Sequence, residues 1–178
     1  TKNAFGDPHV QVKQGKAMID EGIKVIAVVA EDGKILAELV DYANQKGAKI
    51  IAYDRMILNC DLDYYISFDS EKVGEMMANF VVKKRPKGKY IIINGPSSDN
   101  NAILVKKGQM KVLQPYIDSG DIEVILDKES EAWYSLNALI IMDEFLTEYQ
   151  GDIDVVLADS DGLSVGVRDA VVNATRMG

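Results

Sequence analysis

Hydrophobic and polar positions follow two alternating periods along the chain. Short runs of apolar, β-branched residues are followed by longer segments in which apolar residues recur every three or four positions. This alternation is typical of βα units around a parallel sheet, so we predict an α/β fold. The predicted strands are residues 25–30, 49–53, 64–68, 90–94, 122–126 and 153–158, and the predicted helices are residues 8–21, 34–46, 71–85, 102–114, 135–149 and 163–174.

Residues that start and stop helices support these boundaries. Asp7 and Pro8 fit the N-cap and the first helical position, and Gly47 follows the end of a predicted helix. Pro115 is expected to close the fourth helix, because proline cannot continue the backbone hydrogen-bond pattern. Most of the predicted strands are apolar throughout, which indicates that helices cover both faces of the sheets.

One connection is too short to hold a crossover helix. Residues 54–63 separate two predicted strands, which indicates that the chain passes here from one sheet to another. We place the crossing at residues 67–70, so that residues 1–68 form part of an N-terminal lobe and residues 69–178 part of a C-terminal lobe. A lobe of about 60 residues buries little surface, so we expect that strands belonging to the N-terminal lobe are missing from this sequence.

Composition and charge exclude several classes of function. The chain carries 28 Asp and Glu against 20 Lys and Arg, and a net charge of -8 disfavours binding to nucleic acid. One cysteine and one histidine cannot form an internal disulfide or a Cys/His metal cluster. No apolar run approaches the ~20 residues that span a bilayer, so we expect no direct membrane insertion.

Polar side chains follow most of the predicted strands, where open parallel sheets bind their ligands. Carboxylates and amides exchange hydrogen bonds with vicinal hydroxyls, and Arg55 can donate two parallel bonds. The indole of Trp133 can cover the C–H face of a sugar ring. These residue types predict a site for a neutral polyol, although Asp and Asn at such positions also cap helices or form turns, and a single tryptophan also packs in a core.

Motifs of other chemistries are absent from the sequence. It contains no glycine-rich nucleotide motif, P-loop, nucleophile elbow or zinc-protease motif. The run from Asp159 to Gly162 lacks the later glutamate of a calcium loop. The sequence has no second histidine and no evident pairing of a nucleophile with a base. Nothing in it therefore supports a catalytic triad. We therefore expect no enzymatic activity, no metal and no cofactor.

Three strings carry a specific resemblance to a known family. They are AYDRM at residues 52–56, DYYISFDSEKVGE at residues 63–75, and DNNAILVKKGQMKVLQPYIDSG at residues 99–120. They closely resemble bacterial D-xylose-binding proteins, of the type I periplasmic-binding class that serves ABC sugar importers. The resemblance covers essentially the whole chain and implies two Rossmann-like lobes with parallel sheets and with the sugar between them. Family members are longer, so the resemblance implies that the chain is the middle portion of such a protein, without the first strand of the N-terminal lobe and without later strands of the C-terminal lobe.

The resemblance also implies roles for individual residues. An Asp-Arg pair binds sugar hydroxyls, the second lobe adds polar contacts and an aromatic residue stacks on the sugar. The matching ligand-binding positions are Asp54, Arg55, Asp99, Asn101, Trp133, Ser160 and Asp161. Ser160 stands where the family usually has asparagine, and a hydroxyl cannot reproduce the paired donor and acceptor of an amide. This substitution is therefore expected to affect the ligand preference or the affinity.

The function implied by the resemblance is non-catalytic binding of D-xylose or a related pentose outside the cytoplasmic membrane. The receptor would lie in the periplasm, or on the cell surface as a lipoprotein, and deliver the sugar to an ABC permease. Two alternatives remain open. The same receptor could serve a membrane sensor kinase, or the chain could be the effector-binding core of a LacI-like repressor, which requires a helix-turn-helix before residue 1.

Overall fold

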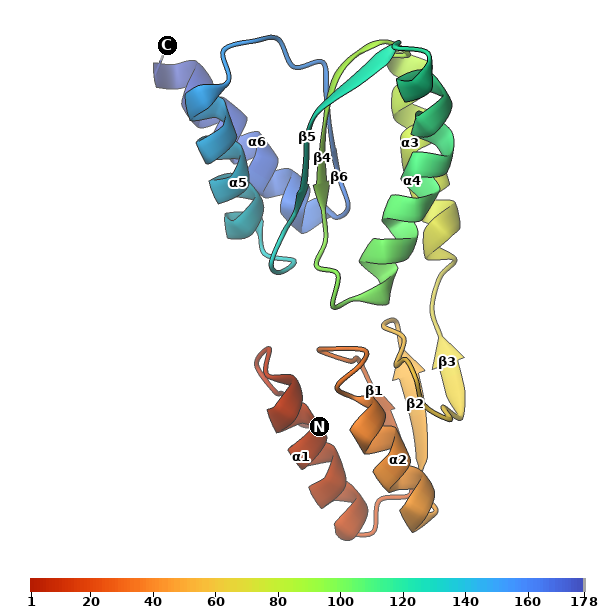
Figure 1. Cartoon of the computed structure of the whole chain (residues 1–178). Coiled ribbons are helices and arrows are strands. Elements are labelled where there is room, and N and C mark those ends of the chain that lie inside the picture. Colours follow the sequence, from red (N-terminus) through yellow and green to blue (C-terminus); the bar gives the residue numbers. More distant parts are fainter. Residues whose placement is uncertain (178) are drawn as a thin grey trace. The chain divides into compact units, whose positions relative to one another are not determined.

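The computed structural model describes residues 1–177 and divides the chain into two compact units (Figure 1). The first unit contains residues 1–68 together with residues 98–101. The second unit contains residues 69–97 and the chain from residue 102 onward. Each unit has its own parallel sheet and its own hydrophobic core.

The first unit consists of a three-stranded sheet with two helices on one face (Figure 1). Its elements are α1 (Pro8–Asp20), β1 (Val25–Val28), α2 (Ala37–Lys46), β2 (Lys49–Tyr53) and β3 (Tyr64–Ile66). The strand order is β1-β2-β3, and both pairs are parallel. Asp7 caps α1 as predicted, because its side chain accepts the backbone N–H groups of His9 and Val10 at 2.8 and 3.0 Å.

In the part of the chain that the structure describes, helices cover only one face of the first sheet. Residues of β1 and β2 alternate between buried and exposed, with Ile26 and Ile50 in the core and Val25 55% exposed. The prediction of two covered faces is therefore wrong for this sheet. Apolar runs alone do not distinguish the two cases, because Val and Ile favour strand geometry on a covered or an uncovered face.

The short link between β2 and β3 keeps both strands in one sheet. Ala52 lies opposite Tyr65 in a parallel pair, although residues 54–63 contain no helix. The expected passage to another sheet thus comes after β3, where α3 (Ser70–Lys84) begins and Asp69 caps it through the backbone N–H of Lys72. A loop of irregular structure is long enough to make a parallel connection here.

The second unit has helices on both faces of its sheet (Figure 1). After α3 come β4 (Gly88–Asn94), α4 (Asn100–Asp118), β5 (Ile122–Glu129), α5 (Ser135–Glu148), β6 (Val155–Ala158) and α6 (Asp161–Met177). The strand order is β5-β4-β6 with parallel pairing. Helices α3 and α4 cover one face and α5 and α6 the other. The central residues from Tyr90 to Ile93 are all 0% exposed, so the prediction of two covered faces is confirmed for β4.

Two glycines allow α3 and α4 to pack closely. A Cβ atom on Gly74 would overlap the carbonyl oxygen of Val105, and one on Gly108 would overlap the carbonyl oxygen of Glu71. Glycine is therefore required on both helices, because any larger residue would push the two backbones apart. This close packing holds α4 against α3 in the second unit.

Pro115 does not close α4, and this prediction is wrong. The helix continues to Asp118, with Pro115 inside it. Tyr116 and Ile117, which follow the proline, pack against the core of the second unit. We attribute the continuation to this packing, which offsets the lost backbone bond. The chain turns at Gly120, whose φ of 75° is the left-handed conformation that glycine adopts easily.

Within the described part of the chain, no helix has both the length and the apolar character that crossing a bilayer requires.

Candidate functional site

Polar loops gather at the carboxyl ends of both sheets. In the second sheet Asn94 lies opposite Glu129, and Ile93 opposite Ala158, so β4, β5 and β6 end at the same edge. In the first sheet Tyr53 lies opposite Ile66. Open parallel sheets bind ligands at such edges, and the predicted residues follow these strands.

Four predicted residues meet within the first unit, in what we call the Arg55 cluster: Asp54, Arg55, Asp99 and Asn101. Arg55 follows the end of β2, and its Nε lies 2.9 Å from Oδ2 of Asp99. Its Nη1 donates to the carbonyl of Ala30 at 3.2 Å and lies 3.9 Å from the carboxylate of Glu31. The guanidinium is thus held in one orientation by oxygen atoms of three residues from two segments of the chain.

Asp54 adopts a backbone conformation that few residues tolerate. Its φ of 65° lies in the left-handed region, which Asp enters more easily than most side chains. Its N–H donates to the carbonyl of Ile66 at 2.8 Å. Its own carbonyl accepts from the hydroxyl of Tyr65 at 3.2 Å and from Nδ2 of Asn101 at 3.1 Å. The backbone is therefore fixed on both sides of the carboxylate.

Asp99 is the most deeply buried member of the cluster, at 4% exposed. Its Oδ1 accepts the backbone N–H of Asn101 at 2.9 Å, while Oδ2 faces Arg55. A buried carboxylate needs such a counter-charge, because transfer of an unpaired charge from water is costly. The cluster therefore presents carboxylate, amide and guanidinium groups in fixed positions, and such groups can bind vicinal hydroxyls.

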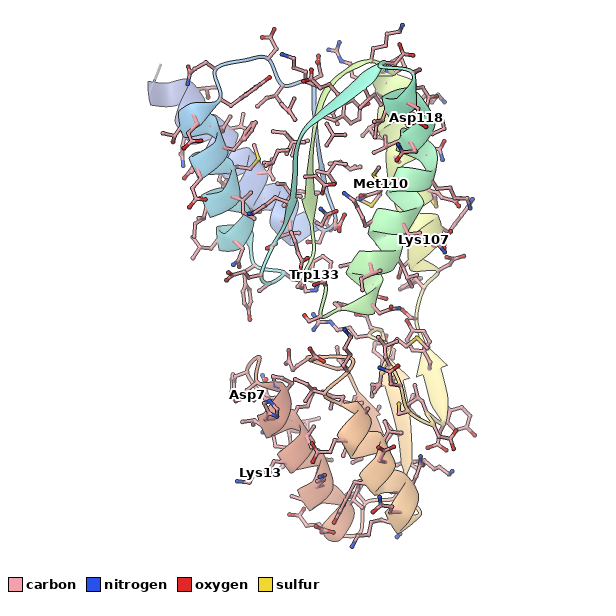
Figure 2. All side chains as sticks on the ribbon, in the orientation of Figure 1. Asp7, Lys13, Lys107, Met110, Asp118 and Trp133 are labelled. Carbon is pink, nitrogen blue, oxygen red and sulfur yellow. The ribbon has the colours of Figure 1, made fainter. Side chains whose placement is uncertain are left out.

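Trp133 lies in the connection between β5 and α5 of the second unit (Figure 2). It is partly buried and packs against the core on the α5 and α6 side. A Cβ atom on Gly95 would overlap the six-membered ring of the indole, so the ring lies directly over the backbone there. The Trp133 side chain therefore packs against the core and also remains partly accessible, and its role as a stacking surface stays a prediction.

Ser160 and Asp161 begin α6. The Ser160 hydroxyl accepts the backbone N–H of Leu163 at 3.2 Å, and its carbonyl accepts the N–H of Ser164 at 2.9 Å. Ser160 therefore acts as a helix cap, the alternative role for such residues. Asp161 is the first residue of the helix and is exposed. Its negative charge suits the positive end of the helix dipole.

Two further residues at this edge were missed by the sequence analysis. Asp159 accepts the backbone N–H of Gly95 through Oδ2 at 2.9 Å and the side-chain amide of Gln109 through Oδ1 at 2.7 Å. Burial raises the pKa of the Asp159 carboxyl above its ordinary value, although both hydrogen bonds act in the opposite direction. Gln109 and Asp159 are 50 positions apart, so no local sequence pattern could have indicated that they form a pair.

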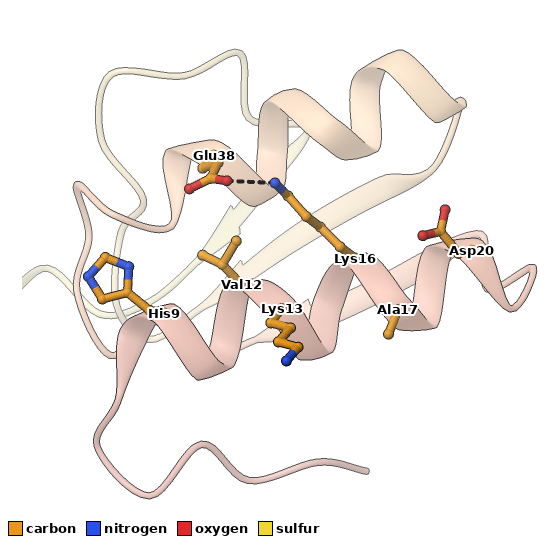
Figure 3. Close-up of a pocket in the computed structure, with 7 residues that line it drawn as sticks. All are labelled: His9, Val12, Lys13, Lys16, Ala17, Asp20 and Glu38. Atoms are coloured by element: carbon orange, nitrogen blue, oxygen red, sulfur yellow. Dashed lines mark hydrogen bonds and ion pairs between the residues drawn. The ribbon is translucent and has the colours of Figure 1, made fainter.

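A surface groove of about 490 Å³ lies along α1, with Glu38 of α2 on its rim (Figure 3). Its charged groups partly satisfy one another, since Lys16 lies 2.6 Å from the Glu38 carboxylate. No tryptophan, tyrosine or phenylalanine lines it among the described residues. It also lies away from the carboxyl ends of the strands, so we assign the candidate site to the strand-end loops.

Comparison with known proteins gives the family. A model of the periplasmic binding protein domain matches residues 1–178. The D-xylose-binding periplasmic protein of Escherichia coli (strain K12) is 43% identical over 170 residues, which are 96% of this chain and 52% of that protein. The chain belongs to the periplasmic binding protein domain family, so the resemblance found in the sequence is confirmed. It spans about half the length of the curated relatives that it matches.

Solved structures agree with the fold. An ABC transporter solute-binding protein from Clostridium phytofermentans with bound β-D-glucose has a TM-score of 0.88 and 31% identity, and the match covers 94% of this chain and 56% of that chain. The fructose-binding periplasmic domain of a hybrid two-component system has a TM-score of 0.89 and 27% identity, over 98% of this chain and 57% of that chain. The predicted α/β fold, with parallel sheets in two groups, is confirmed.

Proposed function

We propose that this chain is the sugar-binding part of a non-catalytic receptor for D-xylose or a related pentose. The observation that carries the proposal is the Arg55 cluster, in which a buried Asp99 carboxylate holds the Arg55 guanidinium at 2.9 Å. Such a pair offers donors and acceptors in fixed positions, so a sugar need not order them when it binds. The second unit would add Trp133 as a stacking surface, with Ser160 and Asp161 as polar contacts.

The energetics favour a small neutral ligand. Hydrogen bonds to charged groups contribute about 1.5–3 kcal/mol each, so about four to six of them support tight binding after ordering costs. An indole adds contact with the C–H face of a sugar. A phosphorylated ligand fits less well, because Asp54, Asp99 and Glu31 would repel its charge.

Relatives point to the same ligand class. Two relatives, 43% and 41% identical to this chain over the 170 aligned residues, are named D-xylose-binding periplasmic proteins. We therefore propose that the receptor works outside the cytoplasmic membrane, in the periplasm or on the cell surface as a lipoprotein, and delivers its sugar to an ABC permease. Catalysis is not part of the proposal, because the cluster offers no nucleophile with an adjacent base.

One specific comparison favours a second role for the receptor, in signalling instead of transport. The fructose-binding domain with a TM-score of 0.89 belongs to a hybrid two-component system. A receptor of this fold can therefore report a sugar to a membrane sensor kinase instead of a permease. Co-purification of the full-length protein with a permease or with a kinase distinguishes the two outputs.

Calorimetric titration of the full-length protein with D-xylose, ribose, arabinose and glucose tests the ligand. We expect saturable binding of at least one pentose, with D-xylose preferred. Absence of a heat signal with every pentose, from protein that melts cooperatively, would overturn the proposal.

A further inference from the structure

The Trp133 ring is supported by a backbone segment with no side chain. The ring lies over Gly95, where a Cβ atom would overlap three of the indole carbons. The backbone of Trp133 is also closely packed, because a Cβ atom on Gly162 would lie 3.0 Å from the Trp133 carbonyl oxygen. The position of the ring therefore depends on where the backbone lies at Gly95, the first residue after β4.

The side chain of Asp159, the residue after β6, holds that backbone. The N–H of Gly95 donates to Oδ2 of Asp159 at 2.9 Å, across 64 residues of sequence. The N–H of Asp159 itself donates to the carbonyl of Ile93 at 3.1 Å, so β6 holds the Asp159 backbone in register with β4. A rotation of the Asp159 side chain would break its hydrogen bond to Gly95.

Gln109 restricts the rotation of the Asp159 side chain. Its Nε2 donates to Oδ1 of Asp159 at 2.7 Å, and the residue is 0% exposed on α4. Its Oε1 is buried and has no hydrogen-bond partner in the described part of the chain. A buried amide with one atom unsatisfied is costly, so this position calls for an explanation beyond packing.

We propose that Gln109 is a positioning residue that sets the orientation of the Trp133 ring through Asp159 and the backbone of Gly95, and thereby tunes the affinity for sugar. Only the last step rests on the proposed function, because the orientation of the ring can be measured without any sugar. Gln109 is neutral and can hold the carboxylate without ionising. The charged groups near Asp159, Lys106 and Asp127, form an ion pair with each other at 2.5 Å.

The test uses the full-length protein labelled with 5-fluorotryptophan. Fluorine NMR gives one resonance for each tryptophan, and its loss in Trp133→Phe assigns the resonance of Trp133. Gln109→Glu places two carboxylates face to face and should shift this resonance in the absence of sugar. The double variant Gln109→Glu/Asp159→Asn exchanges amide and carboxylate, so one hydrogen bond returns and the introduced amide oxygen can still accept from Gly95. It should restore the resonance.

Gln114→Glu is the matched control. Gln114 lies on the same helix and its Nε2 also donates to an aspartate, Asp118, at 2.8 Å, but this hydrogen bond is exposed. This variant should leave the Trp133 resonance unchanged. D-xylose affinity, measured by calorimetry, should fall about tenfold in Gln109→Glu, recover in the double variant and stay unchanged in the control.

An unshifted Trp133 resonance in Gln109→Glu would overturn the proposal, and so would a shift that the double variant does not reverse. If Gln109→Glu does not fold, Gln109→Met removes the donor without adding charge and must shift the same resonance. A resonance that responds as expected in a protein that binds no sugar would support the positioning role and refute the proposed function.

Discussion

The carboxylate of Asp99 is almost fully buried, whereas its partner Arg55 is accessible. The Asp99 side chain is 3% exposed and the Arg55 side chain 23% exposed, with Nε and Oδ2 2.9 Å apart. A hydroxyl that approaches this pair therefore meets the guanidinium first. The aspartate acts mainly as the group that keeps the arginine in place, and the two residues should respond differently to substitution.

Removing Arg55 should cost more stability than neutralising Asp99. Arg55→Met leaves a buried carboxylate without its counter-charge, which costs about 3 kcal/mol when a buried pair is broken. Asp99→Asn removes the charge together with the need for a partner, so its cost should be smaller. Urea denaturation of the full-length protein measures both. Arg168→Met is the control, because Arg168 pairs with Asp169 at 2.8 Å with a side chain 67% exposed. Equal losses in Arg55→Met and Arg168→Met would contradict this prediction.

Asp54 should contribute to sugar affinity through its carboxylate. Asp54→Ala should weaken D-xylose binding by about tenfold or more if the carboxylate accepts from hydroxyls. Alanine also tolerates a φ of 65° poorly, so part of that loss could come from the backbone. Asp54→Asn separates the two effects, because asparagine accepts the left-handed conformation but lacks the charge.

The control for this pair is Asp41→Asn, since Asp41 is an exposed residue of α2 in the same unit. Calorimetry should give weaker binding for both Asp54 variants and unchanged binding for the control. If Asp54→Asn binds as the parent does, the carboxylate has no role in binding, and Asp54 is a turn residue chosen for its backbone conformation.

Local signals predicted most of the fold. The Asp7 cap marked the start of α1, and the apolar run in β4 indicated a strand covered on both faces. These signals succeed because capping and burial act on neighbouring residues. The prediction that Pro115 ends α4 was wrong, because packing of the residues that follow the proline overrides its local preference. The exposed face of β1 was missed because covered and uncovered apolar strands have the same local pattern.

The candidate site was predictable only in part. The strings around Arg55 and Asp99 indicated ligand contacts, and the structure brings those two side chains together. The contact of Gln109 with Asp159 was not predictable, since it joins positions 50 residues apart through a single hydrogen bond. Side-chain orientation after the chain has folded determines such a contact, and no periodicity encodes it.

Glu75 should make the second unit sensitive to acid. Its carboxylate lies 2.5 Å from Lys111 of α4 and 2.8 Å from Lys72, and these contacts lower its pKa from 4.5 to about 2. A lowered pKa in the folded state means that the stabilisation is present above the unfolded value and is lost as pH falls toward about 2. Glu75→Gln should therefore lower the melting temperature at neutral pH and have little effect near pH 2. A constant difference across this range would contradict the assignment.

Asp159 should show the opposite dependence on pH. Burial raises its pKa above 3.8, so the folded protein binds this proton more tightly than the unfolded chain does. The wild-type contribution to stability is therefore full below the unfolded value and declines as pH rises through the folded value. Asp159→Asn lacks this titration and can still accept from Gly95. The melting temperature of the variant, relative to the wild type, should rise as pH increases through this window.

The two variants control for each other. Acid unfolding of the rest of the protein affects both, but Glu75→Gln should lose melting temperature relative to the wild type as pH rises, whereas Asp159→Asn should gain. Differential scanning calorimetry of the wild type and both variants over the acid to neutral range measures the two slopes. Slopes of the same sign would mean that the Asp159 carboxyl is not destabilised by burial. Its contact with Gln109 would then stabilise the charged form more than burial opposes it.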